Sequence, residues 1–205
     1  KNRIEARRVR IAAIKADQAA SNKARIEKIQ TGVAAMDNAW VAHCLASVKE
    51  EDDILVSESQ LALANMSFNR PGTFFGTSPS GGLGWGLGAS LGVKLGQREK
   101  RVFCVVGDGS YMFGNPTPAH FVSAAYDLPV LTVIMNNKMW GSVRKATLGL
   151  YPDGAASSAN QAPLTYLDPA PDYHKIVEAS DGYGEEVKEP RDLPGALERG
   201  LKAVD

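Results

Sequence analysis

The chain has 205 residues, of which 44% are hydrophobic and 22% charged, a composition typical of a globular protein with a full core. Its 23 basic and 23 acidic residues cancel, so no overall charge favours nucleic acid or an anionic membrane as a partner. No apolar run approaches the roughly 18 residues of a membrane span, and no signal peptide is recognisable. Cys104 lies within an apolar run and predicts a buried thiol, and with Cys44 it forms no ligand cluster, so we expect a reduced, cytoplasmic protein.

Residues 1 to about 30 are rich in Ala, Lys, Arg and Glu with scattered Ile, which predicts one or two amphipathic helices. We interpret residues 1–32 as a helical linker and residues 33–205 as the domain proper. Helix-forming residues interrupt the arginines between Arg3 and Arg10, which favours a solvated helix face over a nucleic-acid-binding arm. Because Lys1 stands inside a predicted helix, we expect the chain to be a fragment of a longer protein.

Helices and strands alternate along the rest of the chain. Strands are predicted at residues 54–56, 101–106 and 130–135, with a weak strand at 184–187. Helices are predicted at residues 33–48, 119–126, 173–179 and 193–204. Between them, residues 151–172 are polar and Pro-rich, typical of either an active-site loop or a disordered segment. This order predicts the α/β class, with an open, mostly parallel, doubly wound sheet and helices on both faces.

A dense run of glycines occupies residues 81–88 within a Gly-rich stretch from 74 to 96. Glycines at this density allow another surface to approach the backbone closely, or allow helices to pack tightly. Gly84, Gly86 and Ala89 match the spacing of a dinucleotide fingerprint. That fingerprint follows its strand, whereas here the strand comes after the glycines, so a nicotinamide site is disfavoured.

Two polar clusters carry most of the functional information. Gly107-Asp108-Gly109-Ser110 follows one buried strand, and Asn136-Asn137 follows the next, across a segment long enough for a crossover helix. Both clusters should therefore meet at one edge of the sheet, where such folds bind ligands. One carboxylate with neutral amide oxygens suits Mg²⁺ that shares its coordination with phosphate. Either cluster alone would be typical of a tight turn or a strand end.

With these residues in place, the segment GDGSYMFGNPTPAHFVSAAYDLPVLTVIMNN resembles the thiamine diphosphate-dependent enzymes. The group is that of acetolactate synthase, benzoylformate decarboxylase and related 2-oxo acid decarboxylases and carboligases. The resemblance extends upstream into GGLGWGLGASLGVKLGQREKRVFCVVGDGS and downstream into KMWGSV, and covers about residues 34–204. It implies the thiamine diphosphate-binding fold of the C-terminal domain, with thiamine diphosphate and Mg²⁺ as cofactors.

The resemblance also implies residue roles. Asp108 and Asn137 would bind Mg²⁺ through their side chains, and Met139 through its backbone carbonyl. The residues implied for the cofactor itself are Gln60, Gly109, Ser110, Tyr111, Asn137, Trp140 and Gly141 around the diphosphate, with Leu83 beneath the bent cofactor and the Gly81 carbonyl at the aminopyrimidine. Two departures concern loop geometry: residues 115–118 lengthen the crossover, and Gly88 stands where many members have proline.

In this family a glutamate on a separate pyrimidine-binding domain, in the same or a partner subunit, activates the cofactor toward a 2-oxo acid substrate. Nothing in this chain resembles that domain, so the catalytic residue is unknown here. The resemblance implies a homo-oligomer in the full-length form and an inactive isolated chain. Two other classes remain open: a nucleotide-dependent enzyme on a doubly wound sheet, and a non-catalytic module that keeps the cofactor cradle.

Several other residues have two interpretations. His120 is interpreted as a satisfied surface or helix-start histidine in preference to a general base, and His43 and His174 are interpreted as structural. Trp140 would either shape the pocket or pack. Lys138 and Arg144 would either meet a substrate carboxylate or be solvated.

Overall fold

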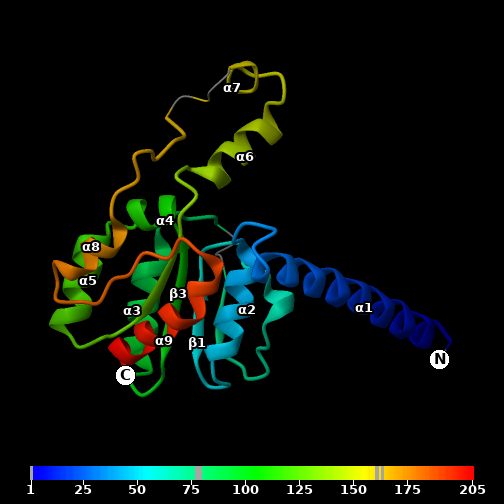
Figure 1. The fold of residues 1–205 in the computed structure, drawn as a ribbon, viewed down its shortest axis with the longest axis horizontal. Helices are drawn as coiled ribbons and strands as arrows, with labels where there is room; N and C mark the ends of the chain where they lie inside the picture. Colours follow the sequence, from blue (N-terminus) through cyan, green and yellow to red (C-terminus); the bar gives the residue numbers. More distant parts are fainter. Residues whose placement is uncertain (1, 77–79, 160–161, 163) are drawn as a thin grey trace. The chain divides into compact units, whose positions relative to one another are not determined.

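The computed structural model describes residues 2–76, 80–159, 162 and 164–205 (Figure 1). The chain forms two compact units, each described by itself. A helical unit comprises Lys1–Glu51, Gln60–Asn69 and Val187–Arg199, and a sheet unit comprises Asp52–Ser59, Arg70–Glu186 and Gly200–Asp205. Among the described residues, no helix is both long enough and apolar enough to cross a membrane.

The helical unit begins with α1 (Asn2–Gln30), a single continuous helix. Its residues 2–10 are all exposed, as expected of a solvated face. Gly32, with φ of +74°, follows the helix end. Helix α2 (Asn38–Val48) starts five residues later than predicted, because Asp37 caps it. The Asp37 carboxylate accepts hydrogen bonds from Ala39 N at 2.7 Å and Trp40 N at 3.1 Å, the usual role of an N-cap residue.

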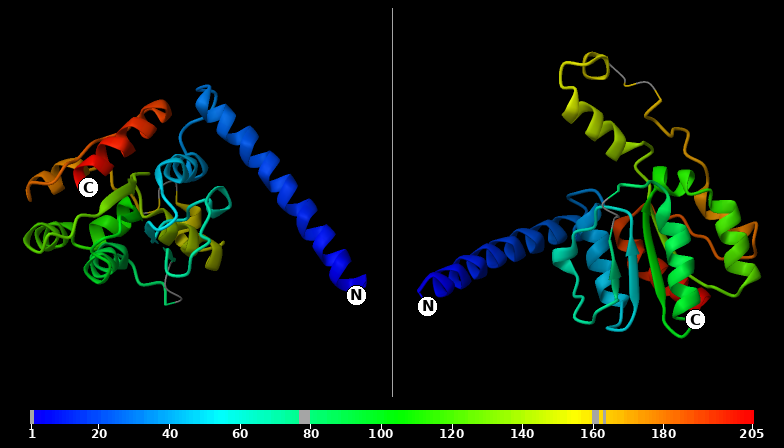
Figure 2. Two further views of the ribbon diagram at one scale, coloured as in Figure 1. Left: turned by 90° about the horizontal axis from the view of Figure 1, so that it is seen from below. Right: turned by 180° about the vertical axis from the view of Figure 1, so that it is seen from behind.

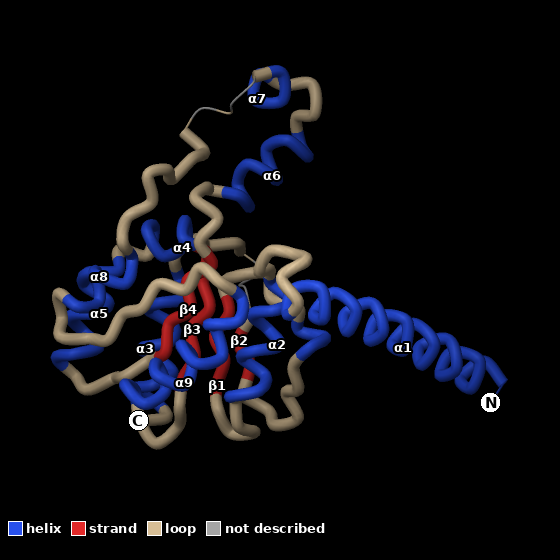
Figure 3. The backbone as a smooth tube through the Cα atoms, viewed as in Figure 1, coloured by secondary structure: helices blue, strands red, loops and turns tan. Residues whose placement is uncertain are grey.

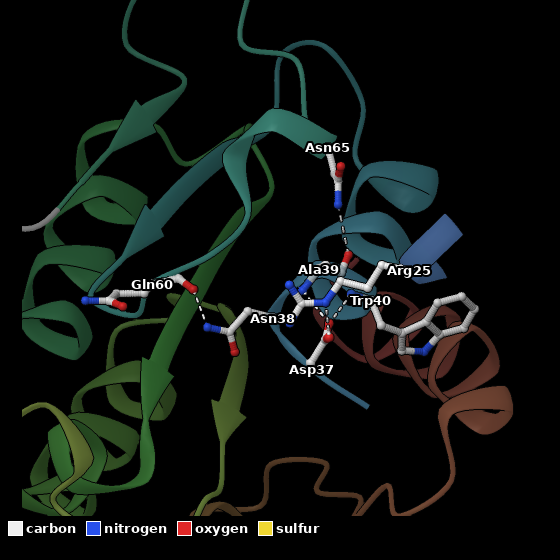
Figure 4. A network of polar contacts seen from close by, with 7 residues as sticks. All are labelled: Arg25, Asp37, Asn38, Ala39, Trp40, Gln60 and Asn65. Atoms are coloured by element: carbon white, nitrogen blue, oxygen red, sulfur yellow. Dashed lines mark hydrogen bonds and ion pairs between the residues drawn. The ribbon is translucent and has the colours of Figure 1, made fainter. Parts of the chain in front are cut away.

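A network of polar contacts connects the segments of the helical unit (Figure 4). Arg25 of α1 pairs with Asp37. Asn38 donates to the Gln60 carbonyl, and Asn65 donates to the Ala39 carbonyl at 3.2 Å. Two short 3₁₀ helices complete the unit: η1 (Leu63–Asn65) and η2 (Pro190–Asp192). The start of α2 is thus held from several sides.

The sheet unit contains four parallel strands in the order β2-β1-β3-β4. They are β1 (Ile54–Ser57), β2 (Phe74–Phe75), β3 (Val102–Gly107) and β4 (Leu131–Met135). The three main predicted strands are confirmed. The two-residue strand β2 was not predicted, because it lies inside the Gly-rich stretch, of which residues 77–79 lie outside the described part of the chain.

The weak strand predicted at 184–187 is wrong: the described residues there form no strand. Gly184 instead lies against helix α8 (Tyr173–Glu178). A β-carbon on Gly184 would lie only 2.0 Å from the His174 carbonyl oxygen. This segment therefore follows a helix rather than a strand edge.

Helices cover both faces of the sheet. The helices of the sheet unit are α3 (Trp85–Gly96), α4 (Asp108–Phe113), α5 (Pro116–Ala125), α6 (Gly141–Leu150), α7 (Ala155–Ser158), α8 and the end of α9 (Leu193–Val204). On one face, Cys104 and Val106 of β3 pack with Leu87 of α3. On the other, Gly200 of α9 lies against Leu131 of β4. Figure 2 shows α3 and the C-terminal end of the chain on opposite sides, which confirms the predicted architecture.

Helix α5 starts three residues earlier than predicted, because Pro116 occupies its first turn. In the first turn a backbone N–H has no partner within the helix, so the missing N–H of proline costs nothing there. Asn115 precedes it in the left-handed region with φ of +54°. The extra residues of the crossover thus form the junction between α4 and α5. Gly88, the other departure, lies within α3 and faces open space, so no neighbour requires a glycine there.

Both cysteines are buried, free thiols. Burial raises the pKa of Cys44 to about 11 and that of Cys104 to about 12. The interpretation of Cys104 as a buried thiol is therefore confirmed.

The Glu58 carboxylate holds the start of α3. Its two oxygens accept from the backbone N–H groups of Gly84 and Gly86. Gly84 has φ of +82°, and a β-carbon there would lie 2.7 Å from Gly114 N. A β-carbon on Gly86 would meet Val106 Cγ1 at 2.9 Å. The glycine run thus allows close packing of α3 against β3 and the end of α4, as one of its two interpretations proposed, and a negative charge stabilises the helix N-terminus.

We expect Glu58→Ala to lower the free energy of unfolding by about 1–3 kcal/mol, because two backbone donors lose their acceptor. Urea denaturation would measure this change. Glu99→Ala, at an exposed position, is the control and should change little. Equal effects of both substitutions would contradict the capping role of Glu58.

Candidate functional site

The register of β3 and β4 brings the two polar clusters together. Gly107 pairs with Met135, so Asp108 and Asn136 follow directly at the same edge of the sheet. Figure 3 shows α4 and the segment leading to α6 beyond this edge. The prediction that both clusters meet at one edge is confirmed.

Two side-chain oxygens converge on one backbone donor. Met139 N donates to Asp108 Oδ2 at 3.2 Å and to Asn137 Oδ1 at 3.1 Å. Lys138, which stands between Asn137 and Met139 in the sequence, is in the left-handed region with φ of +58°, and its N–H donates to Asn136 Oδ1 at 3.1 Å. The turn therefore brings a carboxylate oxygen and an amide oxygen to the same backbone donor and so close to each other, as two ligands of one cation would have to be.

Asp108 is a buried carboxylate, with 2% of its surface exposed. Burial raises the pKa of its carboxyl group, although hydrogen bonds from the backbone of Gly109, Met139 and Lys138 act in the opposite direction. A buried carboxylate is costly unless a cation or hydrogen bonds compensate it. A divalent cation at this position would remove that cost and favour the ionised form.

Helix α4 starts at the site, and its N-cap is Gly107, which has no side chain to accept from the first turn. Ser110 is 8% exposed. Gly109 lies directly under the indole of Trp140, where a β-carbon would be 2.6 Å from Cε3. Gly141 faces Asn137, whose Nδ2 would lie 2.9 Å from a β-carbon. The structure thus brings all of these predicted residues together, and Trp140 both packs and borders the site.

The far end of the long polar passage anchors the turn. Trp140 N donates to the Thr165 carbonyl at 2.8 Å, and Leu167 N donates to the Lys138 carbonyl at 2.7 Å. Lys138 Nζ also pairs with Asp168 Oδ1 at 3.2 Å. Residues 160, 161 and 163 of this passage lie outside the described residues. Its final part is therefore a loop that supports the site, as one of the two interpretations proposed.

A buried cluster of rings lies behind the start of α4. Tyr111 is 1% exposed, and its hydroxyl is 2.6 Å from His120 Nε2. Its ring contacts Tyr173 edge-on, with centroids 5.6 Å apart. Burial lowers the pKa of His120 and raises that of Tyr111, so both groups are neutral near pH 7. His120 thus has a partner, as a satisfied histidine should, and no local pattern in the sequence indicates that Tyr111 is this partner.

Three other predicted cofactor residues, Gly81, Leu83 and Gln60, make no hydrogen bond to Asp108 or Asn137 within the described part of the chain. Gly81 has φ of +65°, and Leu83 is half-buried. Their loop meets the end of α4, where Gly84 packs on Gly114. Gln60 belongs to the helical unit, where it lines a surface cavity of about 460 Å³. The cofactor roles of Gly81, Leu83 and Gln60 stay predictions.

The donor set around Asp108 contains a single carboxylate. In the part of the chain that the structure describes, no group of three or more His, Cys, Asp or Glu side chains gathers to hold a metal ion. Asp108 and Asn137, two of the three predicted Mg²⁺ ligands, lie close together, while the Met139 carbonyl accepts a hydrogen bond from Gly141 N at 2.8 Å. That these oxygens bind Mg²⁺ stays a prediction.

Comparison with known proteins agrees with this geometry. Residues 56–204 match the family described as thiamine pyrophosphate enzyme, C-terminal TPP-binding domain. The isozyme 3 large subunit of acetolactate synthase from Escherichia coli (strain K12) is 31% identical over 137 residues, which are 67% of this chain and 22% of that protein.

Solved structures of two decarboxylases are also similar. The thiamine diphosphate-dependent 4-hydroxybenzoylformate decarboxylase of Rhodococcus jostii RHA1 superimposes with a TM-score of 0.71 at 27% identity, over 83% of this chain and 31% of that one. Benzoylformate decarboxylase from Polynucleobacter necessarius gives a TM-score of 0.68 at 25% identity, over 82% and 31%. The chain therefore spans less than a third of the length of these relatives.

We expect His120 to make stability depend on pH. Burial lowers its pKa in the folded state below the ordinary 6.5, so the unfolded chain binds the proton more readily. The stabilising contribution is present above pH 6.5 and is lost as pH falls toward the folded-state pKa. Denaturation at pH 7.5 and 5.5 should show a decrease that His120→Leu reduces. His43→Gln, at an exposed position, is the control, and an unchanged decrease in His120→Leu would refute this origin.

Proposed function

Because the chain belongs to the thiamine pyrophosphate enzyme family and matches its C-terminal TPP-binding domain over residues 56–204, we propose that it binds thiamine diphosphate together with Mg²⁺. In the full-length protein this chain would be the C-terminal cofactor-binding domain of a 2-oxo acid decarboxylase or carboligase. The observation that carries this proposal is the convergence of Asp108 Oδ2 and Asn137 Oδ1 on one backbone donor, beside the start of α4.

The residues present suit the cofactor. Asp108, Asn137 and the Met139 carbonyl would hold Mg²⁺, and one carboxylate is sufficient because the diphosphate brings further negative charge. The N–H groups of Gly109, Ser110 and Tyr111 would bind diphosphate oxygens at the start of α4. The indole that covers Gly109 leaves this position no room for a side chain, so a glycine is required for Trp140 to pack against the start of α4.

The contribution of this chain is to bind and orient. When bound, the cofactor supplies the electron sink for 2-oxo acid chemistry. The family's activating glutamate is expected on a pyrimidine-binding domain outside this sequence, in the same or a partner subunit of a homo-oligomer. Residues 1–32 would then be a linker to the domain at 33–205. We keep the identity of the 2-oxo acid open, since that partner domain contributes to the substrate pocket.

A nucleotide-binding role has less support. The N–H groups of Gly84 and Gly86, which a dinucleotide fingerprint would offer to a pyrophosphate, donate to the Glu58 carboxylate instead. The glycine run is thus already used in holding α3. The alternative of a non-catalytic cofactor-binding module shares the same cradle and differs only in what the full-length protein contains.

Isothermal titration of thiamine diphosphate into the chain, up to millimolar concentration, tests the proposal. We expect binding that requires Mg²⁺ and that Asp108→Asn weakens at least about 10-fold, because a charged ligand of the cation is lost. Asp108→Asn should also be as stable as the wild type without cation, or more stable, since it removes a buried charge.

The matched control is Asp153→Asn, at an exposed position. It should bind like the wild type. Binding that ignores Mg²⁺ or survives Asp108→Asn would contradict the proposed site. Absence of binding in every variant would contradict the proposal for this chain.

We further expect the chain alone to release no measurable carbon dioxide from 2-oxo acids, because the activating carboxylate is expected on another domain. A coupled decarboxylase assay with pyruvate and benzoylformate would check this. Turnover by the pure chain that is lost in Asp108→Asn would show that the chain carries its own activating group.

A further inference from the structure

Tyr173 presents a buried hydroxyl that nothing yet explains. The residue is 7% exposed, and its Oη has no hydrogen-bond partner among the described residues. A buried donor without an acceptor is costly, and most such groups in folded proteins are satisfied by protein, water or a ligand. A partner beyond the described residues is therefore needed to satisfy this hydroxyl.

The position of this hydroxyl is fixed by its neighbours. The Tyr173 ring meets the Tyr111 ring edge-on, at an interplanar angle of 84°. The Tyr111 hydroxyl is already paired with His120, so it is not the missing partner. Both rings belong to one buried cluster with Leu87, Cys104 and Val106 behind the start of α4. A side chain packed in this way has little freedom to turn away.

The Tyr173 ring contacts Tyr111 of α4, the helix that begins at Asp108. Burial raises the pKa of Tyr173, and the negative charge of Asp108 raises it further. The phenol thus stays protonated near pH 7 and can only be useful there as a neutral donor. Tyr111, which contacts the Tyr173 ring, stands three residues after Asp108 in α4.

Two other buried polar atoms lack partners in the described part of the chain, Trp85 Nε1 and Arg144 Nε. Trp85 packs against Ile54, Val56 and Val102 in a separate apolar cluster. Arg144 lies in α6, where its backbone N–H donates to the Trp140 carbonyl at 2.9 Å. For Tyr173, the ring contact with Tyr111 of α4 and the charge of Asp108 relate the hydroxyl to the proposed site.

We propose that Tyr173 is a further binding residue of this site, whose hydroxyl donates a hydrogen bond to an oxygen ligand of the cation held at Asp108. That oxygen belongs to the diphosphate or to a water on the cation, which have the same acceptor chemistry. The inference rests on the proposed function. A neutral donor suits this place, because it adds a hydrogen bond without adding charge beside a carboxylate.

The test compares Tyr173→Phe with the wild type in titrations with Mg²⁺ and inorganic diphosphate, and with Mn²⁺ alone followed by electron paramagnetic resonance. We expect about 10-fold weaker binding of the Mg²⁺–diphosphate pair, the usual effect of losing a hydrogen bond to a charged group. A loss confined to diphosphate assigns the acceptor to the diphosphate, and an equal loss with Mn²⁺ assigns it to a cation-bound water. Tyr126→Phe, at an exposed tyrosine, is the control.

Stability of the ligand-free chain separates this role from a structural one. Because the hydroxyl has no partner without ligand, Tyr173→Phe should leave the denaturation midpoint unchanged or raise it while it weakens binding. A lowered midpoint or unchanged binding would overturn the assignment of Tyr173. If Asp108→Asn abolishes binding and Tyr173→Phe does not, only this assignment falls. If the wild type binds neither ligand, both the proposed function and the assignment of Tyr173 are contradicted.

Discussion

The parallel pairing of β3 with β4 is the interaction on which the site depends. In a parallel pair both strands end at the same edge, so the residue after Gly107 and the residue after Met135 are neighbours whatever the length of the crossover between them. This explains why an extended crossover, with its extra junction at Asn115, leaves the two polar clusters together. The hydrogen bonds of the sheet fix the separation that a cation site needs.

Close packing of the backbone around that edge depends on glycine and one carboxylate. Gly84 touches the backbone of Gly114, and Gly109 lies under the Trp140 indole. Glu58 satisfies the N–H groups that this packing would otherwise bury. Helix α4 is therefore packed at its start against the Trp140 indole and at its end against Gly84. A rigid arrangement of this kind lowers the entropic cost of binding an anion.

The site carries groups that are costly in the absence of a ligand. Asp108 is buried with its pKa raised, and Tyr173 keeps a hydroxyl without a partner among the described residues. A sequence selected for stability alone would place apolar side chains in such a cluster. Unfavourable polar groups concentrated beside one sheet edge are typical of a binding site, where the ligand supplies the missing interactions.

Much of the fold and of the site could be predicted from the sequence, because strand periodicity and the polar residues after each strand are local features. The meeting of Asp108 and Asn137 at one sheet edge was predicted in this way. Helix α9 also has its predicted bounds. The strand expected at 184–187 is wrong, because Gly184 lies against α8 and because glycine and glutamate are uncommon in strands. The Glu58 cap and the contact between Tyr111 and Tyr173 have no local signal, since each joins residues that are distant in the chain. The sequence by itself determined the family and which polar residues stand at the sheet edge, because these are local patterns. Only the tertiary structure decided which hydrogen-bond donors find an acceptor within the fold, as at Glu58, and which have none among the described residues, as at Tyr173, because each such pairing depends on segments that are distant in the sequence.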